Sequence, residues 1–176
     1  MNVKLTTLAI IAALFSVSSY ASDPVTINVT GKVVASPCTF DTANSNLNID
    51  LGEKSAADLA NPSSAFTEKA FDLAMKDCPA GTTNVTATFS GTDAADLTNG
   101  NAFKNMGTAT NVVIQVKPQS GFWADVSFKN GSTMTSPVNT TAKTATFKLT
   151  TRAVTWTGSV SPGTVSASIV ADFTYQ

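Results

Sequence analysis

The sequence predicts an all-β domain built as an immunoglobulin-like sandwich. Apolar and polar residues alternate in several separate segments, which is the pattern of strands with one buried face. Turn signals rich in Gly, Pro and Asn separate these segments. Beyond the first 21 residues, no segment has the 3.6-residue period of an amphipathic helix. A chain of 176 residues favours a single domain, and such a sandwich needs only about 100 residues.

Residues 1–21 are predicted to be a secretory signal peptide. Lys4 precedes an apolar run over residues 8–15, and Ser19 and Ala21 supply the small residues at −3 and −1 of a cleavage site. The run is shorter than the roughly 20 apolar residues that a membrane span needs. We therefore expect an exported chain that begins at Ser22 after cleavage, with no membrane insertion.

The first alternating segment follows directly, over residues 25–33. Its apolar positions are Val25, Ile27, Val29 and Val33, and Gly31 replaces one apolar residue of the series. Glycine inside a strand marks a bulge or the close approach of another group. This segment is predicted to be a strand.

The middle of the chain predicts further strands. We expect them over residues 47–51, 66–75, 85–89, 112–117 and 144–156. Residues 55–59 have room for one helical turn, and residues 91–111, rich in Asp, Thr, Asn and Gly, predict a long surface connection. Asn130-Gly131 is a turn signal, Pro137 excludes a central strand there, and residues 121–128 are ambiguous.

The last segment, residues 163–176, is the longest clean alternation in the chain. Its apolar positions are Val165, Ala167, Ile169, Ala171, Phe173 and Tyr175. A strand of this length exceeds the usual five or six residues, so a partner is needed to cover its apolar face and pair its edge. A core strand of a complete sandwich is the alternative interpretation.

The two cysteines, Cys38 and Cys78, are predicted to form one disulfide, as expected in an exported chain. A reactive thiol pair is the alternative. Two observations argue against it: the spacing is far from C-x-x-C, and the sequence contains no histidine to activate a thiolate.

The sequence offers no catalytic constellation, so we expect no enzyme, no cofactor and no metal site. Without histidine there is no Ser-His-Asp or Cys-His arrangement, and no phosphate-binding loop appears. A formal charge of −1 with 13% charged residues gives no electrostatic case for binding nucleic acid. Trp123 and Trp156 could stack on a sugar, although core packing accounts for them as well.

Several motifs in order resemble the pilin subunits of chaperone–usher fimbriae, in the type 1 pilus family. They are the signal peptide with the alternating segment around Gly31; Gly31-Lys32-Val33-Val34 leading to Cys38; Cys78-Pro79-Ala80-Gly81-Thr82 leading to residues 85–91; Asn105-Met106-Gly107-Thr108-Ala109 before the strand at 112–116; and the final strand with penultimate Tyr175 and Gly163 fourteenth from the end. The resemblance covers essentially all of the chain after the signal peptide.

The resemblance implies a pilin fold, an immunoglobulin-like sandwich that lacks its last strand and is completed by a donor strand from a neighbouring subunit. Residues 22–34 would be the donor extension and residues 35–176 the pilin domain. Val25, Ile27, Val29, Gly31 and Val33 would enter a neighbour's groove. The groove that receives a donor or chaperone strand would be lined by Gly163, Val165, Ala167, Ile169, Ala171, Phe173 and Tyr175.

The implied partners are a periplasmic chaperone, an outer-membrane usher and neighbouring subunits in a homo- or heteropolymer. The implied function is that of a structural subunit that reaches the cell surface through the periplasm and supports adhesion. The motifs do not separate a major shaft subunit from a minor adaptor. A self-contained secreted β-sandwich that binds a glycan or a host protein is the alternative.

Overall fold

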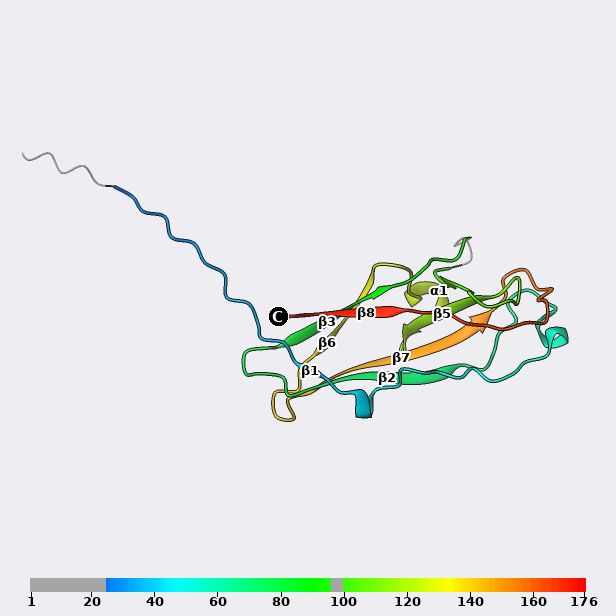
Figure 1. The fold of residues 1–176 in the computed structure, drawn as a ribbon, viewed down its shortest axis with the longest axis horizontal. Coiled ribbons are helices and arrows are strands. Elements are labelled where there is room, and N and C mark those ends of the chain that lie inside the picture. The colour runs from blue at the N-terminus through cyan, green and yellow to red at the C-terminus, as the bar shows by residue number, and fades with distance from the viewer. Residues whose placement is uncertain (1–24, 96–99) are drawn as a thin grey trace, which may run out of the picture. The chain divides into compact units, whose positions relative to one another are not determined.

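The computed structural model describes residues 25–95 and 100–176 of the chain (Figure 1). The predicted signal peptide, residues 1–21, lies outside the described residues. Residues 33–176 form one compact unit, and the described residues up to Lys32 belong to a separate one. Within the described part, no helix is long and apolar enough to span a bilayer.

The compact unit is built almost entirely from strands. They are β1 (Thr39–Phe40), β2 (Lys69–Lys76), β3 (Asn84–Ser90), β4 (Phe103–Lys104), β5 (Val113–Pro118), β6 (Ser132–Pro137), β7 (Ala145–Val154) and β8 (Val170–Tyr175). The helical elements described are the 3-10 turns η1 (Thr42–Asn44) and η2 (Ala56–Leu59) and the single-turn helix α1 (Trp123–Val126).

The strands form two sheets, with every pairing antiparallel. One sheet has the order β1-β2-β7-β5-β4 and the other the order β6-β3-β8. Figure 1 shows β8, in red, running beside β3. The prediction of an all-β, immunoglobulin-like sandwich is confirmed.

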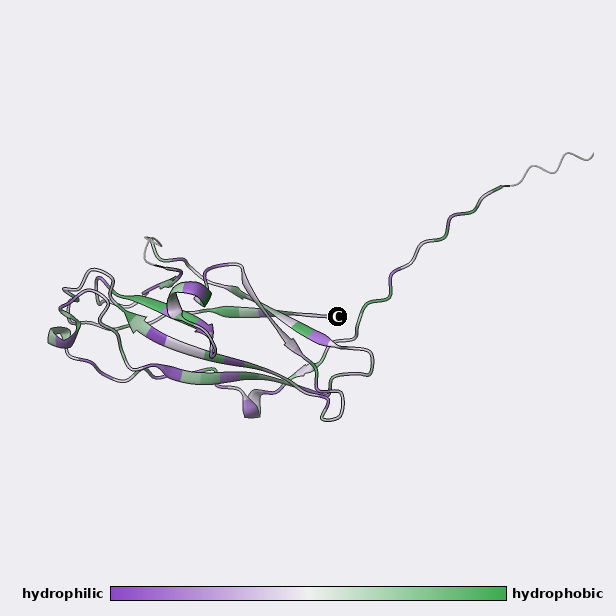
Figure 2. Cartoon of the chain, turned by 180° about the vertical axis from the view of Figure 1, so that it is seen from behind, coloured by the Kyte–Doolittle hydropathy of each residue, from purple (hydrophilic) through white to green (hydrophobic). Residues whose placement is uncertain are grey.

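The core lies between the two sheets and follows from the alternation in their strands. In β3, Val85, Ala87 and Phe89 are buried and the residues between them are half-buried. In β7, Phe147 and Leu149 are fully buried, and exposed Thr146 and Lys148 alternate with them; the same alternation is visible in the hydropathy colours of Figure 2. Because one face of each sheet is apolar, packing the two faces together removes both from water.

A disulfide joins Cys38 and Cys78, as the sequence predicts. It closes the end of the sandwich where β1 begins and β2 ends, and both cysteines belong to the buried core cluster. The predicted helical turn at 55–59 is also confirmed, as η2. Pro137 ends β6, which is an edge strand of its sheet, as expected for a proline that cannot donate a ladder hydrogen bond.

Two predictions for the middle of the chain are wrong. Residues 47–51 alternate as a strand does, but they pair with no neighbour and belong to no strand. Residues 91–111 are more than a surface connection, because they contain β4 and bury Ala94, Ala102 and Phe103. Their polar composition concealed these few core positions.

The predicted strands nearest the two chain ends also differ from expectation. Only residues 170–175 of the last segment form a strand, and residues 163–169 continue it without a β-ladder. Residues 25–33 form no strand at all. Alternation specifies which side chains share a face, but a strand also needs a neighbour to bond.

Candidate functional site

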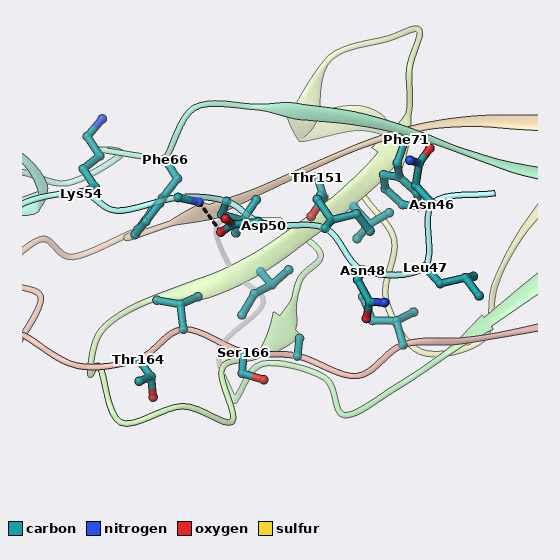
Figure 3. A pocket seen from close by; sticks show the side chains of 18 of the residues that line it. Asn46, Leu47, Asn48, Asp50, Lys54, Phe66, Phe71, Thr151, Thr164 and Ser166 are labelled. Carbon is teal, nitrogen blue, oxygen red and sulfur yellow. Dashed lines mark hydrogen bonds between the residues drawn. The ribbon is translucent and has the colours of Figure 1, made fainter. Parts of the chain in front are cut away.

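A long apolar groove of about 1230 Å³ is the main candidate site of the compact unit. Residues 46–54 form one wall and residues 162–173 form the other (Figure 3). The floor consists of side chains of both sheets and of Phe66, which lies just before β2: Phe40, Phe66, Phe71, Leu73, Phe89, Ile114, Val116 and Thr151. The groove therefore opens directly onto the hydrophobic core of the sandwich.

The structure brings most of the sequence-predicted groove residues together on one wall. Gly163, Val165, Ala167, Ile169, Ala171 and Phe173 all line the groove. Phe173 packs between the rings of Phe40, at 5.9 Å between centroids, and Phe147, at 5.6 Å. The odd-numbered side chains of this segment thus complete the apolar surface, while the even-numbered ones lie at the rim.

The main chain of β8 has one paired edge and one unpaired edge. The N–H of Gln176 donates to the carbonyl of Asn84 at 3.0 Å, and the N–H of Asn84 donates back at 3.1 Å. Because such doubly bonded pairs alternate in an antiparallel ladder, the even-numbered residues of β8 bond to β3. The odd-numbered residues then direct their N–H and C=O groups toward the groove, where β8 is the last strand of its sheet.

Residues 163–169 are held by a loop instead of a strand. The carbonyls of Thr164 and Ser166 accept from the N–H groups of Ala109, at 3.0 Å, and Met106, at 2.8 Å. The N–H of Ser166 donates to Asn105 Oδ1 at 2.9 Å. These bonds also use the even-numbered residues, so the odd-numbered residues keep the same orientation toward the groove along the whole wall.

Gly163 allows this wall to lie against the loop of residues 105–109. A Cβ atom at Gly163 would lie 2.5 Å from the main-chain nitrogen of Ala109. On the loop side, a Cβ atom at Gly107 would lie 2.1 Å from the carbonyl oxygen of Thr164. Both distances are too short for a side chain, so two glycines permit the close main-chain approach that aligns the wall.

The opposite wall, residues 46–54, was missed as a site by sequence reasoning. The N–H of Asn46 donates to the carbonyl of Asp72 at 2.9 Å, which attaches the beginning of the wall to β2. Among the described residues, the N–H groups of residues 47–51 have no hydrogen-bond partner. Leu47 is 59% exposed, and Ile49 and Leu51 are half-buried. The signal was present as alternation in residues 47–51, but alternation alone did not distinguish a groove wall from an interior strand.

Tyr175 lies beyond the groove, at the end of the sandwich that carries the disulfide. Its hydroxyl donates to the carbonyl of Cys38 at 3.4 Å, and burial raises the pKa of the phenol. It is absent from the groove lining. Its contacts instead fix the end of β8 next to the point where residue 38 enters the domain.

The predicted donor residues are exposed to solvent. Val25, Ile27, Val29 and Val33 are 82%, 81%, 88% and 99% exposed, and Figure 2 shows the alternating hydropathy of this segment. A Cβ atom at Gly31 would meet nothing within 4 Å among the described residues. Nothing described in the chain itself therefore requires a glycine at this position.

Two other kinds of chemical site concern the described residues: a sugar-stacking tryptophan and a metal site. Trp123 is already engaged: its indole N–H donates to Glu68 at 2.5 Å, and the Arg152 guanidinium lies 4.2 Å from the ring centroid. The Lys117 ammonium lies 5.0 Å from the same ring. Within residues 25–95 and 100–176, no group of three or more His, Cys, Asp or Glu residues is placed so that it could hold a metal ion.

Comparison with known sequences gives one consistent family. The family model described as "Fimbrial protein" matches residues 27–176. Protein FimG of Escherichia coli strain K12 is 40% identical over 169 residues, covering 96% of this chain and 95% of that protein. The uncharacterized fimbrial-like protein YdeR of the same strain is 38% identical with the same coverage. The S-fimbrial adhesin protein SfaS of Escherichia coli strain 536 is 32% identical over 174 residues, covering 98% and 99% of the two chains.

Solved structures support the fold. The CupB6 tip adhesin from Pseudomonas aeruginosa superposes with a TM-score of 0.61 at 17% identity, covering 80% of this chain and 38% of the adhesin. The type I fimbria protein BPSL1626 of Burkholderia pseudomallei superposes with a TM-score of 0.50 at 23% identity, covering 81% and 90%.

Proposed function

The chain belongs to the fimbrial protein family and is a structural subunit of a surface fimbrium, and from that premise we propose that its groove binds an extended strand of another subunit. One observation carries the proposal. An apolar groove opens onto the core between two walls; the β8 wall directs main-chain groups toward it that lack a strand partner, and on the other wall the N–H groups of residues 47–51 have no hydrogen-bond partner among the described residues.

The chemistry of this groove fits an added β-strand. Main-chain N–H and C=O groups along an exposed sheet edge bind an extended peptide, and pockets for alternate side chains select its sequence. A strand between the two walls would bond to the odd-numbered residues of β8. Its alternate side chains would then point at Phe71, Leu73 and the rest of the floor.

Residues 22–34 are the proposed donor strand. Four apolar side chains, Val25, Ile27, Val29 and Val33, each gain about 1.5–3 kcal/mol when buried. The sum is roughly 6–12 kcal/mol before the loss of chain entropy on ordering. Gly31 would lie over a shallow part of the groove, which explains a glycine that the described residues of its own chain do not require.

Chain length favours donation between molecules. An antiparallel strand with Val25 opposite Phe173 places Val33 opposite Val165. Cys38 is held beside Tyr175 by a hydrogen bond. Tyr175 is ten residues from Val165, which is about 33 Å along a strand at the usual rise per residue. The residues from Val33 to Cys38 reach at most about 18 Å. A subunit therefore cannot fill its own groove in this orientation, and the donor comes from a neighbour.

The same groove gives the other partners their roles. A periplasmic chaperone would supply a strand to the groove before assembly, because the exposed apolar surface invites aggregation. The outer-membrane usher would then be the place where a donor segment replaces the chaperone strand. In this route the subunit crosses the periplasm to the cell surface, and the role is structural and needs no catalytic residue.

A thermal melt tests the proposal. The protein is a chain that begins at Ala35, so that it has no donor segment, and it is heated with and without a synthetic peptide of residues 22–34. We expect the peptide to raise the melting temperature by at least about 10 °C. A peptide with Gly31→Arg is the matched control and should give little increase. A chain that is already stable and indifferent to the peptide would contradict the proposal.

A further inference from the structure

We propose that Lys32 of an incoming donor segment pairs with Asp50 on the rim of the groove, so that a second copy of this chain is a favoured donor. The proposal rests on the strand addition proposed above and specifies its register and partner. It is argued from the orientation of the two walls and from the places of the charged residues along them.

The face on which Lys32 lies follows from the first wall. The odd-numbered residues from Val165 to Phe173 point into the groove and bond toward it. In an antiparallel pair, directly opposite residues share a face. Apolar donor residues must therefore lie opposite odd-numbered wall residues. With Val25 opposite Phe173 and Val33 opposite Val165, Lys32 lies opposite Ser166, with its side chain pointing away from the core.

The second wall runs in step with the first. At one end, Phe40, which precedes the wall by six residues in the chain, has its ring 5.9 Å from that of Phe173, and toward the other end Leu51 and Val165 pack against the same apolar cluster. Figure 3 shows Asp50 on its wall level with Ser166 on the other. A donor strand between the walls would thus carry Lys32 past Asp50.

Asp50 is available for this contact. Its neighbours Ile49 and Leu51 are half-buried, whereas Asp50 is exposed at the rim. One carboxylate oxygen, Oδ1, accepts the N–H of Gly52 at 2.8 Å, which orients the group (dashed line in Figure 3). The carboxylate therefore has a fixed direction and retains the other oxygen for an ammonium group.

Few other charges compete with this pair. Lys32 is the only charged residue among residues 25–34. The next rim positions that a donor would pass, Asn48 and Ser168, are neutral. Glu53 and Lys54, which carry opposite charges, lie further along the same wall. A charge at donor position 32 therefore lies next to Asp50, whereas a charge at donor position 30 lies next to the neutral residues Asn48 and Ser168.

The test exchanges the two charges. A fluorescent peptide of residues 22–34 is bound to the full-length chain, and its dissociation rate is followed by polarisation in low salt. We expect Lys32→Glu in the peptide to speed dissociation about threefold to tenfold. Asp50→Lys in the chain should reverse that preference. A Thr30→Glu peptide, whose neutral neighbours are Asn48 and Ser168, is the matched control and should change the rate less than twofold, roughly.

The outcomes separate the two proposals. Rescue of the Lys32→Glu peptide by the Asp50→Lys chain, weakened by about 0.5 M salt, supports the pair. Equal dissociation of all the peptides from both chains would overturn the pair and leave strand addition intact. If the unmodified peptide does not bind at all, both the pair and the strand addition fail.

Discussion

Residues 25–33 and residues 163–175 have the same alternating pattern and opposite environments. In the last segment the apolar side chains up to Phe173 line a groove, and the even-numbered main-chain groups are bonded to β3 or to the loop of residues 105–109. In residues 25–33 the apolar side chains are exposed and no strand forms. Alternation thus specifies a face that must be buried, and says nothing about what buries it.

The difference also divides the roles of the two segments. The last segment is fixed within its own domain and offers a template with one free edge. The exposed segment lacks a strand partner in the described part of the chain, and in the proposed antiparallel register the chain would be too short to place it in the groove of its own subunit. Under the proposed strand addition, each segment would supply what the other lacks, and this would join two molecules.

The largest expected effect comes from making the donor segment unable to fit. Gly31→Arg should abolish fibre assembly, because the guanidinium cannot enter an apolar groove without losing its hydration. The isolated chain should melt as before, since a Cβ atom at Gly31 meets no described neighbour. Electron microscopy counts the fibres. Thr30→Arg, on the outward face, is the control and should assemble. Normal fibres from Gly31→Arg would refute the donor role.

The next largest effect concerns the disulfide between Cys38 and Cys78, which lies beside the end of β8. Replacing both Cys38 and Cys78 with serine should cost the domain about 2–5 kcal/mol of unfolding free energy, because the disulfide restricts the unfolded chain and anchors residue 38 beside Tyr175. Urea unfolding measures the loss, and chemical reduction of the unaltered protein should reproduce it. Identical midpoints in all three samples would rule out a stabilising bridge.

Two isoleucines sharpen the comparison itself. Ile27→Ala in the chain should leave its melting temperature unchanged, because Ile27 is 81% exposed. The same substitution in the peptide of residues 22–34 should weaken its binding to the groove by about 2–4 kcal/mol. Ile169→Ala, in the half-buried groove wall, should lower both binding and the stability of the chain itself, the latter by about 1–2 kcal/mol. A lower melting temperature for the isolated Ile27→Ala chain would show that residue 27 already packs in its own subunit.

The smallest expected effect is a pH dependence of the acceptor. The pKa of Asp41 lies below its ordinary value of 3.8, chiefly because the Asn44 side chain donates a hydrogen bond to the carboxylate. Desolvation raises this pKa, but the charge of Lys76 and the N–H of Ala43 lower it further. A lowered pKa in the folded state adds stability that is complete above pH about 3.8 and is lost as pH falls through the folded value.

Asp41 holds the turn that leads into the wall of residues 46–54, whereas residues 25–34 contain no carboxylate. Acid unfolding of the wild-type chain should therefore be steeper below pH about 3.8 than that of Asp41→Asn. The comparison is made by circular dichroism at matched ionic strength. Superimposable acid transitions would mean that Asp41 contributes nothing to the wall's stability.

Local features of the sequence were enough to predict most of the architecture. The all-β class, the disulfide between Cys38 and Cys78 and the inward positions of residues 163–173 follow from period-two patterns and cysteine chemistry. These features depend on residues close together in the chain or on the chemistry of one residue type. The assignment of Val25 to Val33 as donor residues remains a prediction that the experiments above can test.

Only the tertiary structure decided what faces residues 163–173. The second wall, residues 46–54, comes from a segment more than 100 residues earlier in the chain, and its alternation looked like that of any strand. Likewise, Ala102 and Phe103 are buried within a polar stretch because β4 pairs with β5. Periodicity is a local property, whereas a groove forms only where distant segments fail to meet. The sequence by itself therefore determined which faces must be buried, and the tertiary structure decided which of them its own domain leaves uncovered.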